Sequence, residues 1–153
     1  MRSTAEVLDH HLKCFAARDM DGVLADYLAD ALFFGPEGAL RGPNAIKPVF
    51  EKMFAEFAKP GASVARKQRL IEGEYAYIVW TSETADNSYE LASDTLVIQD
   101  GSIRLQAFTA KIKPKPASMT RLASNELRAI DWSKCATAGP TCRARKWHQP
   151  ASV

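Results

Sequence analysis

The chain has 153 residues, of which 46% are hydrophobic and 25% are charged, and its formal net charge is +2. This length is enough for one domain with its own core, and so small a net charge gives no reason to expect a nucleic-acid partner. Residues from 117 onward carry a net charge of +4, which leaves −2 for residues 1–116. The mild basicity therefore belongs to the C-terminal segment.

Two features of the sequence bear on the cellular compartment of the protein. The three cysteines, Cys14, Cys135 and Cys142, are odd in number and show no Cys-x-x-Cys spacing, which argues against a disulfide framework and a zinc site. Charged residues interrupt the N-terminal segment, and no run approaches the roughly 20 apolar residues of a membrane helix. We therefore expect a cytoplasmic protein with no membrane partner.

The N-terminal part has the pattern of two helices and a strand. Ser3 followed by Glu6 forms a capping box, and apolar residues then recur at helical spacing, which predicts an amphipathic helix over 4–18. Asp19 suits the N-cap of a second, shorter helix, whose apolar side chains are Val23, Leu24, Tyr27 and Leu28. Residues 31–35 are typical of a short strand.

A third helix and four strands follow. Gly42-Pro43 suits a helix start, and the apolar spacing from Ile46 to Phe57 predicts the helix itself. Because Pro48 lacks a backbone donor, we expect an irregular first turn or a start nearer Lys47. Turn residues then separate strands over 63–72, 75–84, 88–98 and 103–113. Their short links predict antiparallel pairing and an α+β class.

Two strands have apolar residues on both faces, in the segments YAYIVW at 75–80 and LASDTLVI at 91–98. A sheet covered on one side alternates apolar with polar residues, whereas a sheet covered on both sides need not. Helices account for one face only. We therefore expect a homodimer through the other face, with coverage by the segment after residue 116 as the alternative.

Asp94 and His11 are the first candidates for chemistry. An acid in the middle of a strand is unusual, and a buried carboxyl with a raised pKa can donate a hydrogen bond to a ligand oxygen. The alternative is that Asp94 pairs with Arg104. His11 lies on the apolar stripe of the first helix, as an acid–base group or as a core histidine, while adjacent His10 should be solvated.

Other residues carry weaker signals. Tyr27, placed on the second helix, offers a polar tip on an apolar ring, with packing as the alternative. Trp80 and Ser82 share a strand face and could line a cavity, and the alternative for Trp80, which we favour, is a core residue. Arg66, Lys67 and Arg69 form a basic cluster that we interpret as a solvated strand face. Motifs for nucleotides, serine hydrolases and zinc proteases are absent, so we expect no metal and no cofactor.

The order of these segments resembles a known family. FAARDMDGVLADYLADALFFGPEGALRGPNAI at 15–46, EGEYAYIVW at 72–80 and DTLVIQDGSIRLQAF at 94–108 are together similar to the SnoaL-like group of the nuclear transport factor 2-like superfamily. The resemblance covers about residues 5–113. It implies a cone-shaped fold, with three helices packed on the concave face of a curved, mainly antiparallel sheet. It also implies an apolar cavity and, often, dimers through the convex face.

The resemblance carries residue roles only in part. The oxyanion-binding acid of the ketosteroid isomerases falls on Asp94 and their helix-1 tyrosine on His11, but their general base falls on Gly35, which has no side chain. The catalytic triad of the epoxide hydrolases falls on Trp80, Ser82 and Phe108, so it is absent. The alignment directs six side chains to the cavity: Trp80, Ser82, Asp94, Arg104, Gln106 and Phe108.

Two hypotheses follow. In the first, a SnoaL-like domain over 1–116 binds a small apolar molecule bearing a carbonyl or hydroxyl, and Asp94 and His11 transfer protons in a cyclase, isomerase or hydrolase-type reaction. Tyr27 adds a donor, and Trp80 and Phe108 form walls. In the second, the same fold is a non-catalytic ligand-binding or dimerisation module. Residues 117–153 are expected to form an irregular or disordered extension.

Overall fold

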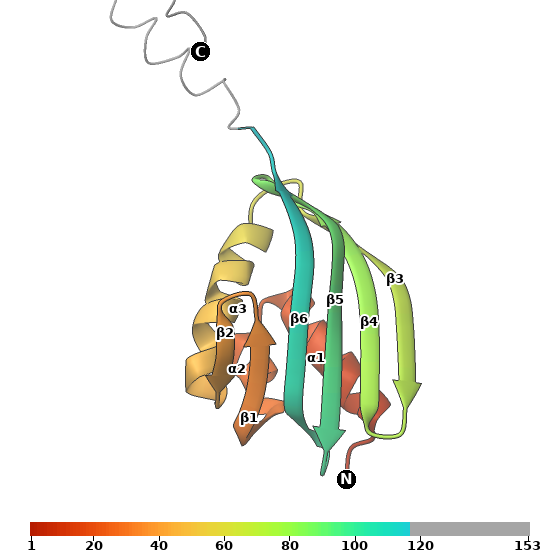
Figure 1. The fold of residues 1–153 in the computed structure, drawn as a ribbon. Helices are drawn as coiled ribbons and strands as arrows, with labels where there is room; N and C mark the ends of the chain where they lie inside the picture. The colour runs from red at the N-terminus through yellow and green to blue at the C-terminus, as the bar shows by residue number, and fades with distance from the viewer. Residues whose placement is uncertain (117–153) are drawn as a thin grey trace, which may run out of the picture. The chain divides into compact units, whose positions relative to one another are not determined.

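The computed structural model describes residues 1–116, which form one unit of three helices and a curved six-stranded sheet. The helices lie against one face of the sheet (Figure 1). This arrangement confirms the α+β class and the cone-shaped fold with helices on the concave side. The predictions for 117–153 lie outside the described residues.

Helix α1 spans Thr4–Ala17, close to the predicted bounds. The Ser3 side chain accepts a hydrogen bond from the Glu6 backbone N–H, and the Glu6 carboxylate accepts one from Ser3, so the capping box is confirmed. The helix buries Val7, Leu8 and His11 against the sheet. Its amphipathic stripe therefore supplies one wall of the interior.

Helix α2 is shorter than predicted and spans only Met20–Ala25. Strand β1 follows at Tyr27–Gly35, so Tyr27 belongs to the sheet and its placement on a helix was wrong. The cause is tertiary. The Asp26 carbonyl accepts the Ile103 N–H at 2.7 Å, and Tyr27 pairs with Ile103, which draws the chain out of the helix.

Strand β2, Gly38–Arg41, was not predicted from the sequence. It forms an antiparallel hairpin with β1, in which Gly35 pairs with Gly38. Four residues with little apolar patterning give no signal on their own, because pairing with β1 is what makes them a strand.

Helix α3 spans Pro43–Phe57 and contains Pro48. The predicted start at Gly42-Pro43 is confirmed, and the alternative start near Lys47 is wrong. Gly42 adopts φ 80°, and a side chain there would meet the Ala29 carbonyl oxygen. Pro48 is the sixth residue of the helix, so it leaves the Asn44 carbonyl without its intrahelical donor, and the helix continues through it.

The sheet has the order β2-β1-β6-β5-β4-β3. Strands β3 (Ser63–Glu72), β4 (Tyr75–Glu83), β5 (Asn87–Gln99) and β6 (Ser102–Pro114) form an antiparallel meander, as predicted. Strand β1 pairs with β6 in parallel, and among residues 1–116 this is the one parallel pairing. The N-terminal hairpin thereby widens the surface that the helices cover.

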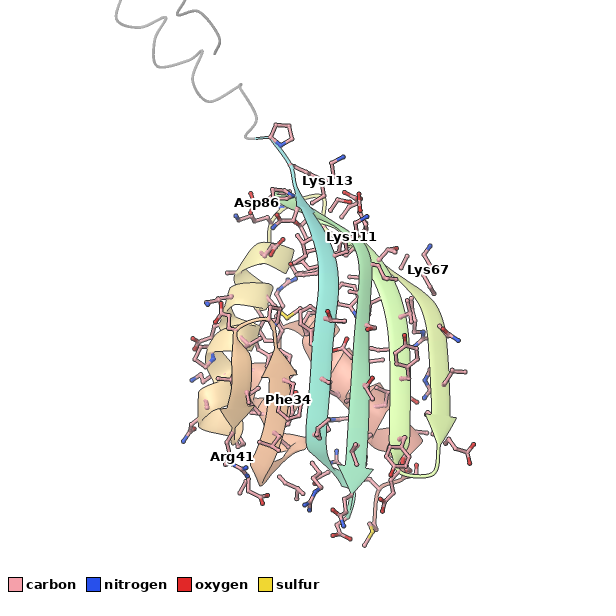
Figure 2. The ribbon with its side chains drawn as sticks, in the orientation of Figure 1. Phe34, Arg41, Lys67, Asp86, Lys111 and Lys113 are labelled. Carbon is pink, nitrogen blue, oxygen red and sulfur yellow. The ribbon has the colours of Figure 1, made fainter. Side chains whose placement is uncertain are left out.

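The face of the sheet opposite the helices has a row of mainly apolar side chains. One residue from each of five neighbouring strands pairs with the next across the sheet, in the order Leu70, Tyr77, Thr95, Ala107 and Phe34. Leu70 is 53% exposed and Phe34, labelled in Figure 2, is 42% exposed. The apolarity of both faces is therefore real, while its coverage by a second copy of the chain stays a prediction.

The C-terminal turn of α3 is joined to the β4–β5 turn by one carboxylate. Half-buried Glu56 accepts hydrogen bonds from the side chains of Thr84, Asn87 and Tyr89 at 2.7 to 2.8 Å. Charge-assisted bonds of this kind are stronger than neutral ones. Glu56 therefore fixes the end of α3 on the sheet.

We predict that Glu56→Ala lowers the free energy of unfolding by about 1–3 kcal/mol, because it leaves three part-buried donors without their acceptor. Glu51→Ala, in the same helix but exposed, should cost less than about 0.5 kcal/mol, since its one ion pair lies at the surface. Urea denaturation measures both. Equal losses in the two variants would contradict the assignment.

Candidate functional site

A cavity of about 390 Å³ lies between the helices and the concave face of the sheet. Its walls are mostly apolar, and this size is within the usual range for a small-molecule site. The lining residues are Leu8, His11, Leu12, Phe15, Ala16, Arg18, Phe33, Phe50, Met53, Phe57, Ala62, Ser63, Val64, Arg66, Ile78, Trp80, Asp94, Leu96, Gln106 and Phe108.

Asp94 is the acid in this wall, and a chain of hydrogen bonds fixes its carboxyl group. Trp80 Nε1 donates to one oxygen at 2.9 Å, and Gln106 Nε2 donates to the other at 2.8 Å. The Gln106 carbonyl oxygen in turn accepts from the Tyr27 hydroxyl. Three strands, β4, β6 and β1, therefore hold the carboxyl group of a fourth, β5.

The pKa of Asp94 lies above its ordinary value of 3.8. Burial raises the pKa, because the charged form is desolvated, and the bonds from Trp80 and Gln106 and the nearby His11 offset only part of that effect. Burial, with the charges of Asp94 and Asp26, also raises the pKa of Tyr27. Both shifts act in favour of the protonated, neutral form.

His11 lines the cavity from α1, and behind it lies the fully buried carboxylate of Asp26. The distance from His11 Nδ1 to Asp26 Oδ2 is 3.6 Å, and Nδ1 has no hydrogen-bond partner among the described residues. The ring also meets Tyr27 and Phe50 edge-on. These contacts orient His11 with one nitrogen toward an acid.

Asp26 has two further partners outside the cavity. Arg2 Nη1 donates to it at 2.7 Å, and His10 Nδ1 lies 2.9 Å from both carboxylate oxygens. His10 is exposed, as expected, with 45% of its side chain accessible, but its ring also turns to Asp26. Arg2, His10 and His11 thus surround the buried carboxylate of Asp26.

The pKa of Asp26 lies below its ordinary value of 3.8. Burial acts to raise it, but the hydrogen bonds from His10 and Arg2 and the nearby His11 ring stabilise the charged form and outweigh that effect. The two acids near His11 therefore differ: Asp26 has a lowered pKa and Asp94 a raised one.

The structure brings five of the eight candidate residues to the cavity: His11, Trp80, Asp94, Gln106 and Phe108. Tyr27 is outside the lining and contacts two lining residues, Gln106 and His11. Ser82 is buried but outside the lining, and its hydroxyl donates to the Ser63 carbonyl at 2.6 Å. The roles of all these candidate residues as ligand contacts stay predictions.

Arg104 lies on the other face of the sheet. Ile98 pairs with Ile103 and Val97 with Leu105, so Arg104 is the extra residue of a β-bulge, and the in–out alternation breaks there. It donates to Gln99 at 3.0 Å and does not pair with Asp94. The alignment with the family placed it with Gln106, because a bulge leaves no local signal in the sequence.

Within residues 1–116, no group of three His, Cys, Asp or Glu side chains is placed to hold a metal ion. No helix in this part of the chain has the length and apolarity needed to cross a bilayer.

The sequence profile of the SnoaL-like domain matches residues 8–106, which is well over half of the chain. The chain belongs to the SnoaL-like domain family. No curated protein sequence matches it. The matched segment contains most of α1, every cavity-lining residue except Phe108, and the whole Asp94 network.

Solved structures agree on the fold of this SnoaL-like chain. A protein described as a ketosteroid isomerase from Kribbella flavida is 14% identical, with 78% of this chain and 86% of that one covered and a TM-score of 0.59. One described as a polyketide cyclase from Sinorhizobium meliloti is 13% identical, with 67% and 93% covered and a TM-score of 0.56.

A third neighbour is TerC, crystallised with polyporic acid, at 16% identity, with 81% of this chain and 96% of that one covered and a TM-score of 0.57. Identities this low establish a shared fold and leave the chemistry to the residues of each site.

Three site residues of this SnoaL-like chain were missed from the sequence. Asp26 was read as part of a helix, although an acid between an apolar helix and an apolar strand was a usable signal. Arg18 and Arg66 line the cavity, and the view of Arg66 as part of a solvated strand face was incomplete. Their positions depend on how α1 lies on β3.

We predict that carboxyl ¹³C NMR finds the pKa of Asp94 above 3.8 and that of Asp26 below it, for the reasons of burial and hydrogen bonding given above. Assignment follows from the loss of one signal in each Asp→Asn variant. The reverse order would contradict the described network.

Because the pKa of Asp26 is lowered in the folded chain, its charge stabilises the fold above its unfolded pKa. That contribution is lost as the pH falls through the folded value. The stability gap between the native chain and Asp26→Asn should therefore be largest near neutral pH and should shrink below about pH 4.

Proposed function

We propose that this SnoaL-like domain binds a small, mainly apolar molecule with a carbonyl or hydroxyl group and transfers a proton to or from it. The observation that carries the proposal is that one apolar cavity has both Asp94 and His11 in its wall. Polar groups converging in an apolar pocket are the usual signature of a binding or catalytic site.

Asp94 would bind the ligand oxygen. Each carboxyl oxygen already accepts one hydrogen bond, from Trp80 or from Gln106, so the group is held in place before a ligand arrives. A neutral carboxylic acid in an apolar wall donates its proton to a carbonyl oxygen and stabilises negative charge that develops there. The raised pKa of Asp94 favours that neutral form.

His11 would exchange the proton. Its Nδ1 faces the Asp26 carboxylate at 3.6 Å, which leaves Nε2 for a ligand. A proton taken up by the ring would lie beside a negative charge that Arg2 and His10 also hold in place. Asp26 is then a positioning residue, because it acts through His11.

The relatives agree with this class of ligand. TerC was crystallised with polyporic acid, and the two bacterial neighbours are described as a polyketide cyclase and a ketosteroid isomerase, names that indicate mainly apolar molecules bearing oxygen. Gly35 at the position of the isomerase base favours a second candidate, a SnoaL-like domain that binds such molecules without catalysis.

We predict that Asp94→Asn weakens binding of 2-tetralone about tenfold, because it removes the acid proton donor. Binding of tetralin, which has the same rings and no oxygen, should not change. Isothermal titration measures both, and Asp30→Asn, an exposed isosteric change on β1, is the control. Unchanged 2-tetralone binding, or an equal loss for tetralin, would remove Asp94 from the site.

We predict that the chain accelerates exchange of the α-protons of 2-tetralone in D₂O, and that His11→Gln slows this exchange by about 100-fold or more. Proton NMR follows the reaction. Asp30→Asn, the exposed change on β1 outside the cavity lining, should keep the native rate. If 2-tetralone binds but exchanges no faster than in buffer, the domain is a binding protein and the catalytic half of the proposal fails.

A further inference from the structure

The arginines of this chain divide into two groups. Residues 1–116 contain six, and four of them form side-chain hydrogen bonds: Arg2, Arg41, Arg69 and Arg104. The other two, Arg18 and Arg66, form neither a side-chain hydrogen bond nor an ion pair within the described residues. They are also the two arginines in the cavity lining.

The two come from different elements and reach the same end of the cavity. Thr4 bonds the Gly73 carbonyl and Asp9 pairs with Arg69, so α1 runs antiparallel to β3. From Asp9 to Arg18 the helix rises about 13 Å. From Arg69 back to Arg66 the strand covers about 10 Å. Arg18 and Arg66 are thus at a similar height.

This end of the cavity is its opening, because both arginines are exposed while lining it. Asp94, the one acid in the lining, lies in the buried wall, and its raised pKa favours the neutral form. The Asp19 carboxylate, next to Arg18 in sequence, accepts the Gly22 N–H as the cap of α2. No described carboxylate pairs with either guanidinium at the opening.

The backbone conformation of Arg18 is a second indication that its side chain has a functional role. Arg18 ends α1 with φ 56°, a left-handed conformation in which glycine is the common residue. An arginine there keeps its guanidinium at the cavity instead of bonding the last carbonyls of the helix.

We infer that the ligand is a carboxylic acid, with its carboxylate at Arg18 and Arg66 and its apolar body in the cavity. This rests on the proposed function, because the ligand's other oxygen then reaches Asp94 and His11. Guanidinium groups match the planar, two-oxygen geometry of a carboxylate. The site thus selects amphipathic acids over neutral molecules of the same shape.

The test compares 6-hydroxy-2-naphthoate with its primary amide and with 2-naphthol, by isothermal titration against the full chain. We expect the acid to bind about 30-fold more tightly than the amide. Arg18→Gln and Arg66→Gln should each remove about fivefold to tenfold of that preference and leave amide binding within about twofold, because both arginines are partly screened by water. Arg18→Gly removes the guanidinium with a residue that suits the backbone.

Lys67→Gln is the matched control. Lys67 is next to Arg66 on β3 but lies outside the cavity lining, and Figure 2 shows it extending from the outer strand. This variant should bind all three compounds like the native chain. Raising NaCl from about 50 to about 500 mM should reduce the acid's advantage, since screening acts on exposed charges.

The outcomes separate the two proposals. If 2-naphthol and the amide bind in an Asp94-dependent way and the acid has no advantage, the proposed function stands and the carboxylate inference fails. An acid advantage that survives both arginine variants also overturns the inference. If none of the three compounds binds, the proposed function fails and this inference fails with it.

Discussion

The buried carboxylate of Asp26 is the constraint on which the arrangement of helices and sheet depends. Its side chain collects Arg2, His10 and His11, and its carbonyl oxygen accepts the Ile103 N–H of β6. A buried charge without partners costs several kcal/mol, so the stability of the fold depends on these contacts forming together. One residue thereby ends α2, starts β1 and turns the His11 ring to the cavity.

The pKa values of the two acids near the cavity are shifted in opposite directions by their surroundings. Asp26 is surrounded by cationic and donor groups, which lower its pKa, whereas Asp94 is desolvated in an apolar wall and bonded to neutral donors. Carboxyl groups whose environments separate their pKa values are the basis of acid–base division of labour in many enzymes. His11 lies between these two environments, which is why the proposed proton transfer is assigned to it.

Features that local pattern determines were predictable from the sequence. The capping box, the apolar stripe of α1 and the hairpin turns gave the helices and the β3–β6 meander, and an acid in mid-strand gave Asp94. Features set by contacts between distant segments were not: β2 exists through pairing with β1, and α2 ends early through the contacts of Asp26. The bulge at Arg104 reversed that side chain for the same reason.

The central claim is that Asp94 and His11 form the polar end of a ligand cavity. A crystal structure of the chain with 2-naphthol tests it most directly. The account predicts the ring among the apolar walls and the hydroxyl oxygen within about 2.6–3.2 Å of the Asp94 carboxyl group. A ligand bound outside the cavity, or one whose oxygen points away from both residues, would contradict it.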